Sequence, residues 1–146
     1  MVDYKQYEAK CKKIQKANKS LLADFETWLK SSGLSDKTIN NHLSNIDFYI
    51  NEYLLYKDII EARDGVDSVS MFMGYWFIHK AMWASQASMK NYATSLKRFY
   101  AFLVEKGLIH KEVLNRLKKT IKEEMSEWLT SLKRYDDLGK QGMENI

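Results

Sequence analysis

The sequence predicts an all-α helical bundle, and three observations support this fold class. Apolar residues recur at helical spacing along most of the 146-residue chain, and no segment alternates with the period of two that a half-buried strand needs. Proline is absent and glycine occurs only six times, so the chain lacks the turn residues that all-β folds require. With 45% hydrophobic and 29% charged residues, its composition is that of one ordinary globular domain.

The N-terminal segment predicts a long helix. Its inward positions follow a 4-3-4-3 spacing: Tyr7, Cys11, Ile14, Asn18, Leu21, Phe25 and Trp28. This spacing fits one continuous helix, or two collinear helices with a break near Ser20, whose hydroxyl could cap the second. Gly33 stands where a left-handed residue commonly ends a helix.

A second helix is expected to begin after Ser35, a favourable N-cap residue, with Asp36 in its first turn. Its predicted core positions are Ile39, Leu43, Ile46, Ile50, Tyr53 and Leu54. The predicted outer face carries amides, hydroxyls and one base: Lys37, Asn40, Asn41, Ser44 and Asn45. Asn and Ser are mediocre helix formers, so helix propensity does not explain this face. It is either a contact surface or simply a tolerated polar one.

The middle of the chain reads as an acidic loop over residues 57–67, followed by a short, strongly apolar helix over Val69–His79. The Met and Trp residues in and around this helix are interpreted as core rather than as a cofactor site. They are Met71, Met73, Met82, Met89, Trp76 and Trp83.

The next predicted helix begins at Ser85 or Ser88, either of which could cap it, and ends before Gly107. Its buried stripe is Met89, Tyr92, Ala93, Leu96, Phe99, Tyr100 and Leu103. Its outer face gathers polar and basic residues: Gln86, Ser88, Lys90, Asn91, Thr94, Lys97 and Arg98. Such a face suits a helix that lies against DNA, where lysine and arginine side chains neutralise phosphates. The alternative is a basic face that is merely solvated.

A final amphipathic helix is expected from about Lys111 to Arg134. Its apolar stripe is Leu114, Leu117, Ile121, Met125, Trp128 and Leu132, which must pack on the bundle or on a second chain. The predicted organisation is therefore an N-terminal helical extension (1–19), a helical bundle (20–110), an amphipathic helix (111–135) and a flexible tail (136–146).

The charge distribution is more informative than the net charge of +4. Residues 1–20 carry six lysines and two acids, whereas residues 22–79 carry nine acids and four bases. No carboxylate occurs from Ser68 to Val104. We interpret residues 69–83 as a mostly buried segment, and residues 85–104 as a phosphate-facing surface.

The sequence offers little for catalysis or cofactor binding. Cys11 is the only cysteine, so neither a disulfide nor a Cys/His zinc site can be written, and the glycines form no phosphate-binding loop. We therefore expect no metal, no cofactor and no small-molecule substrate. No apolar run reaches the length of a membrane span and the N-terminus lacks a signal-peptide core, so a cytoplasmic protein without a membrane partner is expected.

Two segments carry a family resemblance. FETWLKSSGLSDKTINNHLSNIDFYINEYL (Phe25–Leu54) and SMKNYATSLKRFYAFLVEKGLI (Ser88–Ile109) resemble the two hallmarks of the core-binding, SAM-like domain of tyrosine recombinases and phage integrases. The segments occur in the expected order and separation, and with the helix between them they cover roughly residues 20–110. The resemblance implies a SAM-like bundle with a four-helix core, to which this chain adds long N- and C-terminal helices.

In that family the domain forms half of a clamp around DNA, and two of its helices reach the major groove. Carried over by position, the implied DNA-binding residues are Ser35, Lys37, Thr38, Asn40, Asn41, Ser88, Lys90, Asn91, Thr94, Lys97 and Arg98. Asn40, Asn41 and Asn91 would lie closest to base edges. Family members often have a basic residue just before the capping residue of the later helix, where this chain has Ala87. This departure puts direct recognition of DNA bases at that position in doubt.

A larger departure concerns catalysis. Full recombinases add a catalytic domain with a His-x-x-Arg pair and a tyrosine nucleophile, but no histidine here has Arg three residues on, and only about 36 residues follow Ile109. The chain would therefore bind DNA without cutting it. It would be either a domain of a longer recombinase or a stand-alone relative, and Met1 and the unpatterned end favour the latter.

The expected function is thus non-catalytic binding of double-stranded DNA, with a cytoplasmic, nucleoid-associated location in a prokaryote. The alternative is a helical interaction module that binds protein and not DNA. In that alternative the stripe from Leu114 to Leu132 would be a partner surface or would form a homo-oligomer.

Overall fold

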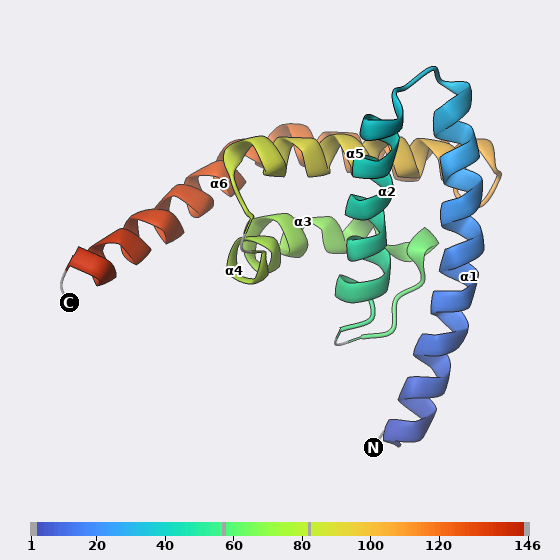
Figure 1. Ribbon diagram of the computed structural model, residues 1–146, viewed down its shortest axis with the longest axis horizontal. Helices are drawn as coiled ribbons and strands as arrows, with labels where there is room; N and C mark the ends of the chain where they lie inside the picture. The colour runs from blue at the N-terminus through green and yellow to red at the C-terminus, as the bar shows by residue number, and fades with distance from the viewer. Residues whose placement is uncertain (1–2, 57, 82, 145–146) are drawn as a thin grey trace.

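The computed structural model describes residues 3–56, 58–81 and 83–144, with side chains described as far as residue 139. Within these ranges the chain forms helices and connecting segments and contains no strand, so the predicted all-α class is confirmed (Figure 1). The helices pack around one hydrophobic core, and the two ends of the chain lie far apart.

Helix α1 (Tyr4–Ser31) is a single helix, so the continuous alternative holds and no break occurs at Ser20. Asn18 lies on its inward face and is buried, where its Nδ2 donates to Asn51 Oδ1 at 2.8 Å. The predicted end is confirmed, since Gly33 has a φ of 76°, a conformation that favours glycine.

Helix α2 (Asp36–Asp47) runs back beside α1 and continues into η1 (Phe48–Tyr53), a π-helical stretch. Ser35 is the N-cap, as predicted, because its Oγ accepts from the Thr38 backbone N–H at 3.3 Å. Of the predicted core positions, four are buried and Leu43 and Tyr53 are partly buried; the buried ones are Ile39, Ile46, Ile50 and Leu54.

The segment after η1 contains two short 3₁₀ turns, η2 (Ala62–Asp64) and η3 (Val66–Ser68). A helical segment then runs through α3 (Val69–Met71), the π-helical η4 (Phe72–Trp76) and α4 (Phe77–Lys80), which confirms the predicted apolar helix.

The prediction that all the Met and Trp residues of this region fill the core is wrong in part. Met73 and Met89 are buried and Trp76 is partly buried, but Met71 is 62% exposed and Trp83 is 53% exposed. Met71 points outward because its neighbours at inward helical positions, Val69 and Phe72, take the core side. Trp83 lies in the connection before α5, and Met82 lies outside the described residues.

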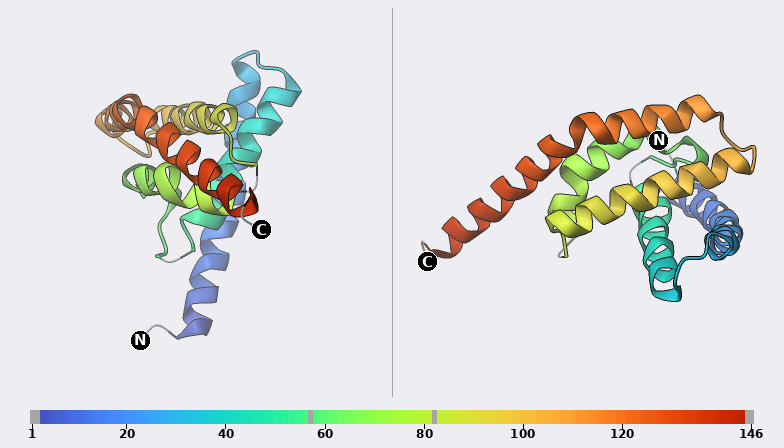
Figure 2. Two further views of the ribbon diagram at one scale, coloured as in Figure 1. Left: turned by 90° about the vertical axis from the view of Figure 1, so that its left-hand side faces the viewer. Right: turned by 90° about the horizontal axis from the view of Figure 1, so that it is seen from above.

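Helices α5 (Gln86–Glu105) and α6 (Lys111–Glu144) run antiparallel, side by side (Figure 2). Ser85 rather than Ser88 caps α5, and Gly107, with a φ of 76°, ends it. Every residue of the predicted α5 stripe is buried.

The apolar stripe of α6 is buried within the same chain. Its buried members are Leu114, Leu117, Ile121, Trp128 and Leu132, and they belong to the core of the bundle. The interpretation of this stripe as a surface for a partner or second copy is therefore wrong. The competing possibility, packing on the chain's own bundle, is the one observed.

The predicted flexible tail at 136–146 is also wrong as far as Glu144, because α6 continues to that residue. Extending an existing helix needs no new nucleation, and this segment contains no proline. The last turns extend away from the bundle (Figure 1). Residues 145–146 lie outside the described residues.

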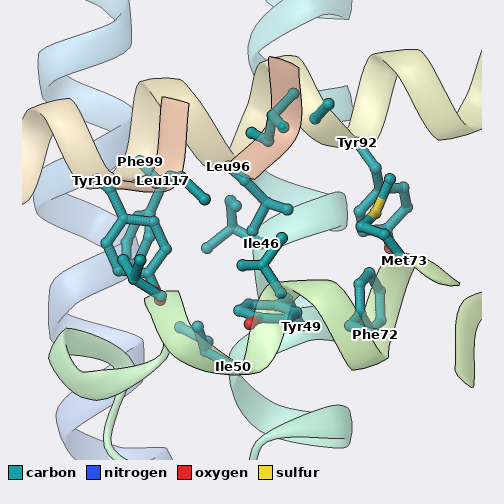
Figure 3. Packing of buried hydrophobic residues seen from close by; sticks show 14 of the residues in the cluster. Ile46, Tyr49, Ile50, Phe72, Met73, Tyr92, Leu96, Phe99, Tyr100 and Leu117 are labelled. Atoms are coloured by element: carbon teal, nitrogen blue, oxygen red, sulfur yellow. The ribbon is translucent and has the colours of Figure 1, made fainter. Parts of the chain in front are cut away.

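The core joins α5 to α2, η1 and η4 (Figure 3). Tyr92 of α5 packs on Phe72 of η4, with ring centroids 5.5 Å apart, and Leu96 points toward Ile46 of α2. Two buried tyrosines also hold the turn between η2 and η3, since Tyr49 Oη donates to Gly65 O at 2.7 Å and Tyr100 Oη donates to Ala62 O at 2.8 Å. Burial raises the pKa of both phenols well above the usual value, so both stay protonated donors.

The turn between η2 and η3 predicts a strong effect of Gly65→Ala. A Cβ at this position would lie 2.5 Å from Tyr100 Oη and 2.8 Å from Leu54 Cδ1, so buried atoms must move. We expect the free energy of unfolding to fall by about 1–3 kcal/mol, measured by urea denaturation followed by circular dichroism.

The matched control is Gly139→Ala in the exposed part of α6, where no atom lies within 4 Å of the new Cβ. It should leave stability unchanged or raise it by up to about 1 kcal/mol through helix propensity. Equal effects of the two substitutions would show that the Gly65 turn is not tightly packed.

Candidate nucleic-acid interface

The structure brings into contact the two helices that carry the predicted DNA-binding residues. Helices α2 and α5 pack across one another, and their contact is made by His42 and Asn45 of α2 with Asn91 and Ser95 of α5. Thr94 and Arg98 lie three residues after Asn91 and Ser95, on the adjoining face of α5. Of the side chains carried over from the resemblance, Asn91 takes part in this crossing, and Thr94 and Arg98 lie next to it on α5.

A buried polar network forms this crossing. His42 Nδ1 lies 2.6 Å from Ser95 Oγ, and Asn45 Nδ2 donates to Ser95 Oγ at 3.0 Å and to Asn91 Oδ1 at 2.8 Å. His42 is 2% exposed and Ser95 is fully buried. Because the groups satisfy one another, the two helices have a preferred register at this point.

The surroundings of His42 favour its neutral form. Burial lowers the pKa of His42, and the positive charge of Arg98 lowers it further. Ser95 Oγ accepts from Asn45, and its bond with His42 Nδ1 runs in the direction that the tautomer of the ring sets.

Four of the predicted site residues use their hydroxyls within the helices. Ser35 and Thr38 bond to each other at the start of α2, where the Ser35 hydroxyl donates to Thr38 Oγ1 at 3.0 Å. Ser88 forms a reciprocal capping box with Ser85, and Thr94 Oγ1 donates to Lys90 O at 3.2 Å. These residues shape the helix ends and surface.

Other predicted site residues keep their polar groups unpaired. Six side chains form no hydrogen bond or ion pair with any part of the chain that the structure describes: Lys37, Asn40, Asn41, Lys90, Lys97 and Arg98. Asn91 differs, because its Oδ1 accepts from Asn45. Arg98 is notable because its Nε is buried and has no acceptor among the described residues, a state that calls for an explanation.

The nearest carboxylates of these helices lie at their ends. Asp36 is in the first turn of α2 and Asp47 is its last residue. At the end of α5, Glu105 accepts from the Trp28 indole N–H, and Lys106 pairs with Asp24 at 2.8 Å. The middle of the α5 outer face is thus left with bases and no acid of its own.

A second basic surface lies on α1. Lys5, Lys12, Lys16 and Lys19 occupy one exposed face opposite the inward residues of this helix, and none has an ion-pair partner within residues 3–56, 58–81 and 83–144. The sequence showed an excess of lysines in residues 1–20, but their alignment on one face of α1 was not predicted.

Of the residues at this crossing, one was predicted at the wrong position from the sequence and two were not predicted. Asn45 was predicted on the outer face of its helix but is buried, because α5 covers that side of α2. His42 and Ser95 were not predicted. Both stand at inward helical positions, next to core residues such as Leu96, and a polar residue at a core position is the signal of an interhelical bond.

Other kinds of site find no support in the described residues. They contain no group of three or more His, Cys, Asp or Glu side chains placed to hold a metal ion. None of their helices is both long enough and apolar enough to cross a membrane. Comparisons with known protein families, curated proteins and solved structures find no match for this chain.

The neutral state of His42 predicts a pH-dependent stability. Because its folded pKa lies below the unfolded value of about 6.5, the unfolded chain takes up the proton first as the pH falls. The free energy of unfolding should therefore decline below about pH 6.5, by at most about 1.4 kcal/mol per pH unit for this one proton.

Urea denaturation of the wild type and His42→Gln between about pH 7 and about pH 5 tests this expectation. The variant should show the shallower decline, since glutamine takes up no proton and the other titrating groups are common to both chains. A decline of equal slope in both would rule out the neutral, buried state of His42.

Ser95→Ala removes the centre of the network. It leaves His42 and Asn45 buried without this partner, so we expect a loss of about 1–3 kcal/mol in the free energy of unfolding. Ser44→Ala, on the exposed face of α2, is the matched control and should change stability by less than about 0.5 kcal/mol. Similar effects at both positions would contradict a structural role for the network.

Proposed function

We propose that this chain binds double-stranded DNA, without catalysing a reaction on it, through the outer face of α5 and the first half of α2. The observation that carries the proposal is a set of cationic and amide side chains left unpaired on α2 and α5, together with the absence of any carboxylate between Ser68 and Val104. On α5, such side chains attract a polyanion without competition from acids of the same helix, whereas α2 carries Asp36 and Asp47 at its ends.

The basic side chains of α5 are suited to contacts with phosphates. Lys90 and Lys97 are seven residues apart and so lie on the same side of the helix. Arg98 lies beside them, and a phosphate oxygen is a suitable acceptor for its unpaired guanidinium. We therefore assign affinity, rather than sequence preference, to these three side chains.

The asparagine side chains of α2 are suited to contacts with the edges of DNA bases. Asn40 and Asn41 are exposed, and an Asn carboxamide can pair with adenine through two hydrogen bonds. Asn91 has its oxygen engaged by Asn45, which leaves only its Nδ2 group for DNA. Sequence preference in this proposal therefore depends on α2 more than on α5.

The resemblance of Phe25–Leu54 and Ser88–Ile109 to recombinase core-binding domains supports the same two helices. These segments correspond to the last part of α1 with α2 and η1, and to α5 with the turn after it. The proposal carries over the DNA-binding role alone, because the chain lacks the His-x-x-Arg pattern of the catalytic domain.

A protein-binding module is the second candidate, and one observation favours it. Leu138, in the last turns of α6, is 67% exposed, and Tyr135, one turn before it, is 43% exposed and packs on His79 of α4. With the stripe from Leu114 to Leu132 buried, a homo-oligomer through α6 would have to use these last turns. Sedimentation at several concentrations, with Leu138→Lys as the variant, tests this candidate.

Fluorescence anisotropy of a mixed-sequence duplex of about 25 base pairs, titrated at several salt concentrations, tests DNA binding. Lys97→Gln/Arg98→Gln should weaken binding to all sequences alike and reduce the log–log salt slope by up to about 2. Lys90→Gln/Lys97→Gln should do the same, and it keeps Arg98, whose charge lowers the pKa of His42.

Lys12→Gln/Lys16→Gln on α1 is the matched control, because it removes the same charge from the other basic surface. It should leave the salt slope nearly unchanged. Equal losses in the α1 and α5 variants would mean that net charge, and not the α2–α5 face, attracts the DNA. No binding of the wild-type chain at low salt would exclude the proposed function.

A further inference from the structure

An aromatic pocket opens beside the end of η1 and has no role in the proposed DNA interface. Its volume is about 380 Å³, and residues of η1, the following loop, α3 and η4 line it. The wall contains Tyr53, Tyr56, Tyr75 and Trp76, with Asp58 as its one carboxylate. None of its lining residues belongs to α5.

The rings of the pocket are set at steep angles to one another. The Trp76 ring lies 5.1 Å from Tyr53 at an interplanar angle of 60°, and 6.1 Å from Tyr56 at 61°. The Trp76 indole nitrogen is buried, so this side chain meets the pocket with ring carbons and not with its N–H. Inclined aromatic surfaces of this kind attract cations through the negative charge of their faces.

The charged side chain that lines the pocket is negative, as a cation-binding site requires. Asp58 is exposed and forms no ion pair among the side chains that the structure describes. The pocket is built from the part of the chain, residues 22–79, in which acids outnumber bases by nine to four. A carboxylate next to tyrosine and tryptophan rings favours a positively charged occupant and disfavours a phosphate.

The rim of the pocket extends its apolar surface. Tyr56 is 62% exposed and Tyr75 is 58% exposed, and Met71 lies on the same rim. Tyr, Trp and Met are the side chains enriched where proteins meet partner proteins. A free small cation would leave this rim uncovered, whereas a polypeptide would cover it.

We propose that this pocket binds an arginine side chain of a partner protein, with the guanidinium against Tyr56 and Trp76 and beside Asp58. Arginine fits better than lysine because its planar, weakly hydrated group stacks on aromatic faces and still pairs with a carboxylate. The inference does not depend on the proposed DNA binding, and the two surfaces could be occupied together.

The test uses the full chain and a capped peptide, acetyl-Leu-Arg-Leu-Gly-amide, observed by ¹H–¹⁵N correlation spectra of the indole groups. Trp76→Phe assigns the Trp76 signal. The peptide should shift this signal saturably, and the analogue with citrulline in place of arginine should bind at least about fivefold more weakly. Citrulline keeps the shape of arginine and removes its charge.

Tyr56→Ala and Asp58→Asn should each weaken peptide binding by about threefold or more. Because both side chains are exposed, neither variant should alter the thermal unfolding curve. Tyr4→Ala and Asp137→Asn change the same residue types at exposed positions outside the pocket, and they should bind the peptide as the wild type does.

Three results would overturn the proposal. The first is no saturable shift of the Trp76 signal up to the solubility limit of the peptide. The second is equal affinity for the arginine and citrulline peptides, which would mark an apolar pocket without cation preference. The third is an equal loss of binding in the pocket variants and their controls.

Discussion

The burial of α5 is the constraint on which the rest of the structure depends. Its apolar stripe faces the aromatic core, where Phe99 lies edge-on to Phe25 of α1 with ring centroids 5.3 Å apart. Its second side is covered by α2, and α6 runs beside it. The helix is left with a narrow outer strip for contact with anything else. All three bases of the proposed interface on α5 lie on or beside this strip.

The crossing of α2 and α5 is polar where a simple bundle would be apolar. A buried network that satisfies its own hydrogen bonds contributes little net stability, but an arrangement that breaks it leaves costly unpaired groups. The network therefore favours one register of the two helices over its neighbours. Since the proposed DNA contacts come from both helices, that register also sets the spacing between the asparagine side chains of α2 and the basic side chains of α5.

The two proposed surfaces differ in chemistry and are formed by different residues. The α2–α5 face carries unpaired lysine, arginine and asparagine side chains, which suits a phosphate backbone. The pocket around Trp76 is aromatic and acidic, which suits a cationic side chain. The basic side chains of α5 lie in the acid-free stretch from Ser68 to Val104, whereas Asp58 of the pocket belongs to the acid-rich residues 22–79.

Much of the secondary structure was predictable because its causes are local. Ser35, Ser85, Gly33 and Gly107 act through their own backbone and nearest neighbours, so the helix boundaries at these residues followed from sequence. The buried stripe of α5 followed in full from its periodicity. The far end of α6 did not, since continuation of a helix past its last packed turn leaves no periodic signal.

By itself, the sequence determined the fold class, the helix caps, the inward stripes and the grouping of charge, because each is set by residues within a few positions of one another. Only the tertiary structure decided which elements cover which faces. It buried Asn45 under α5, paired His42 with Ser95 and left Met71 exposed. It also turned the α6 stripe inward and joined Tyr56 to Trp76 in one pocket. These outcomes depend on contacts between residues distant in sequence, and periodicity shows that a face is apolar or polar without showing which surface meets it.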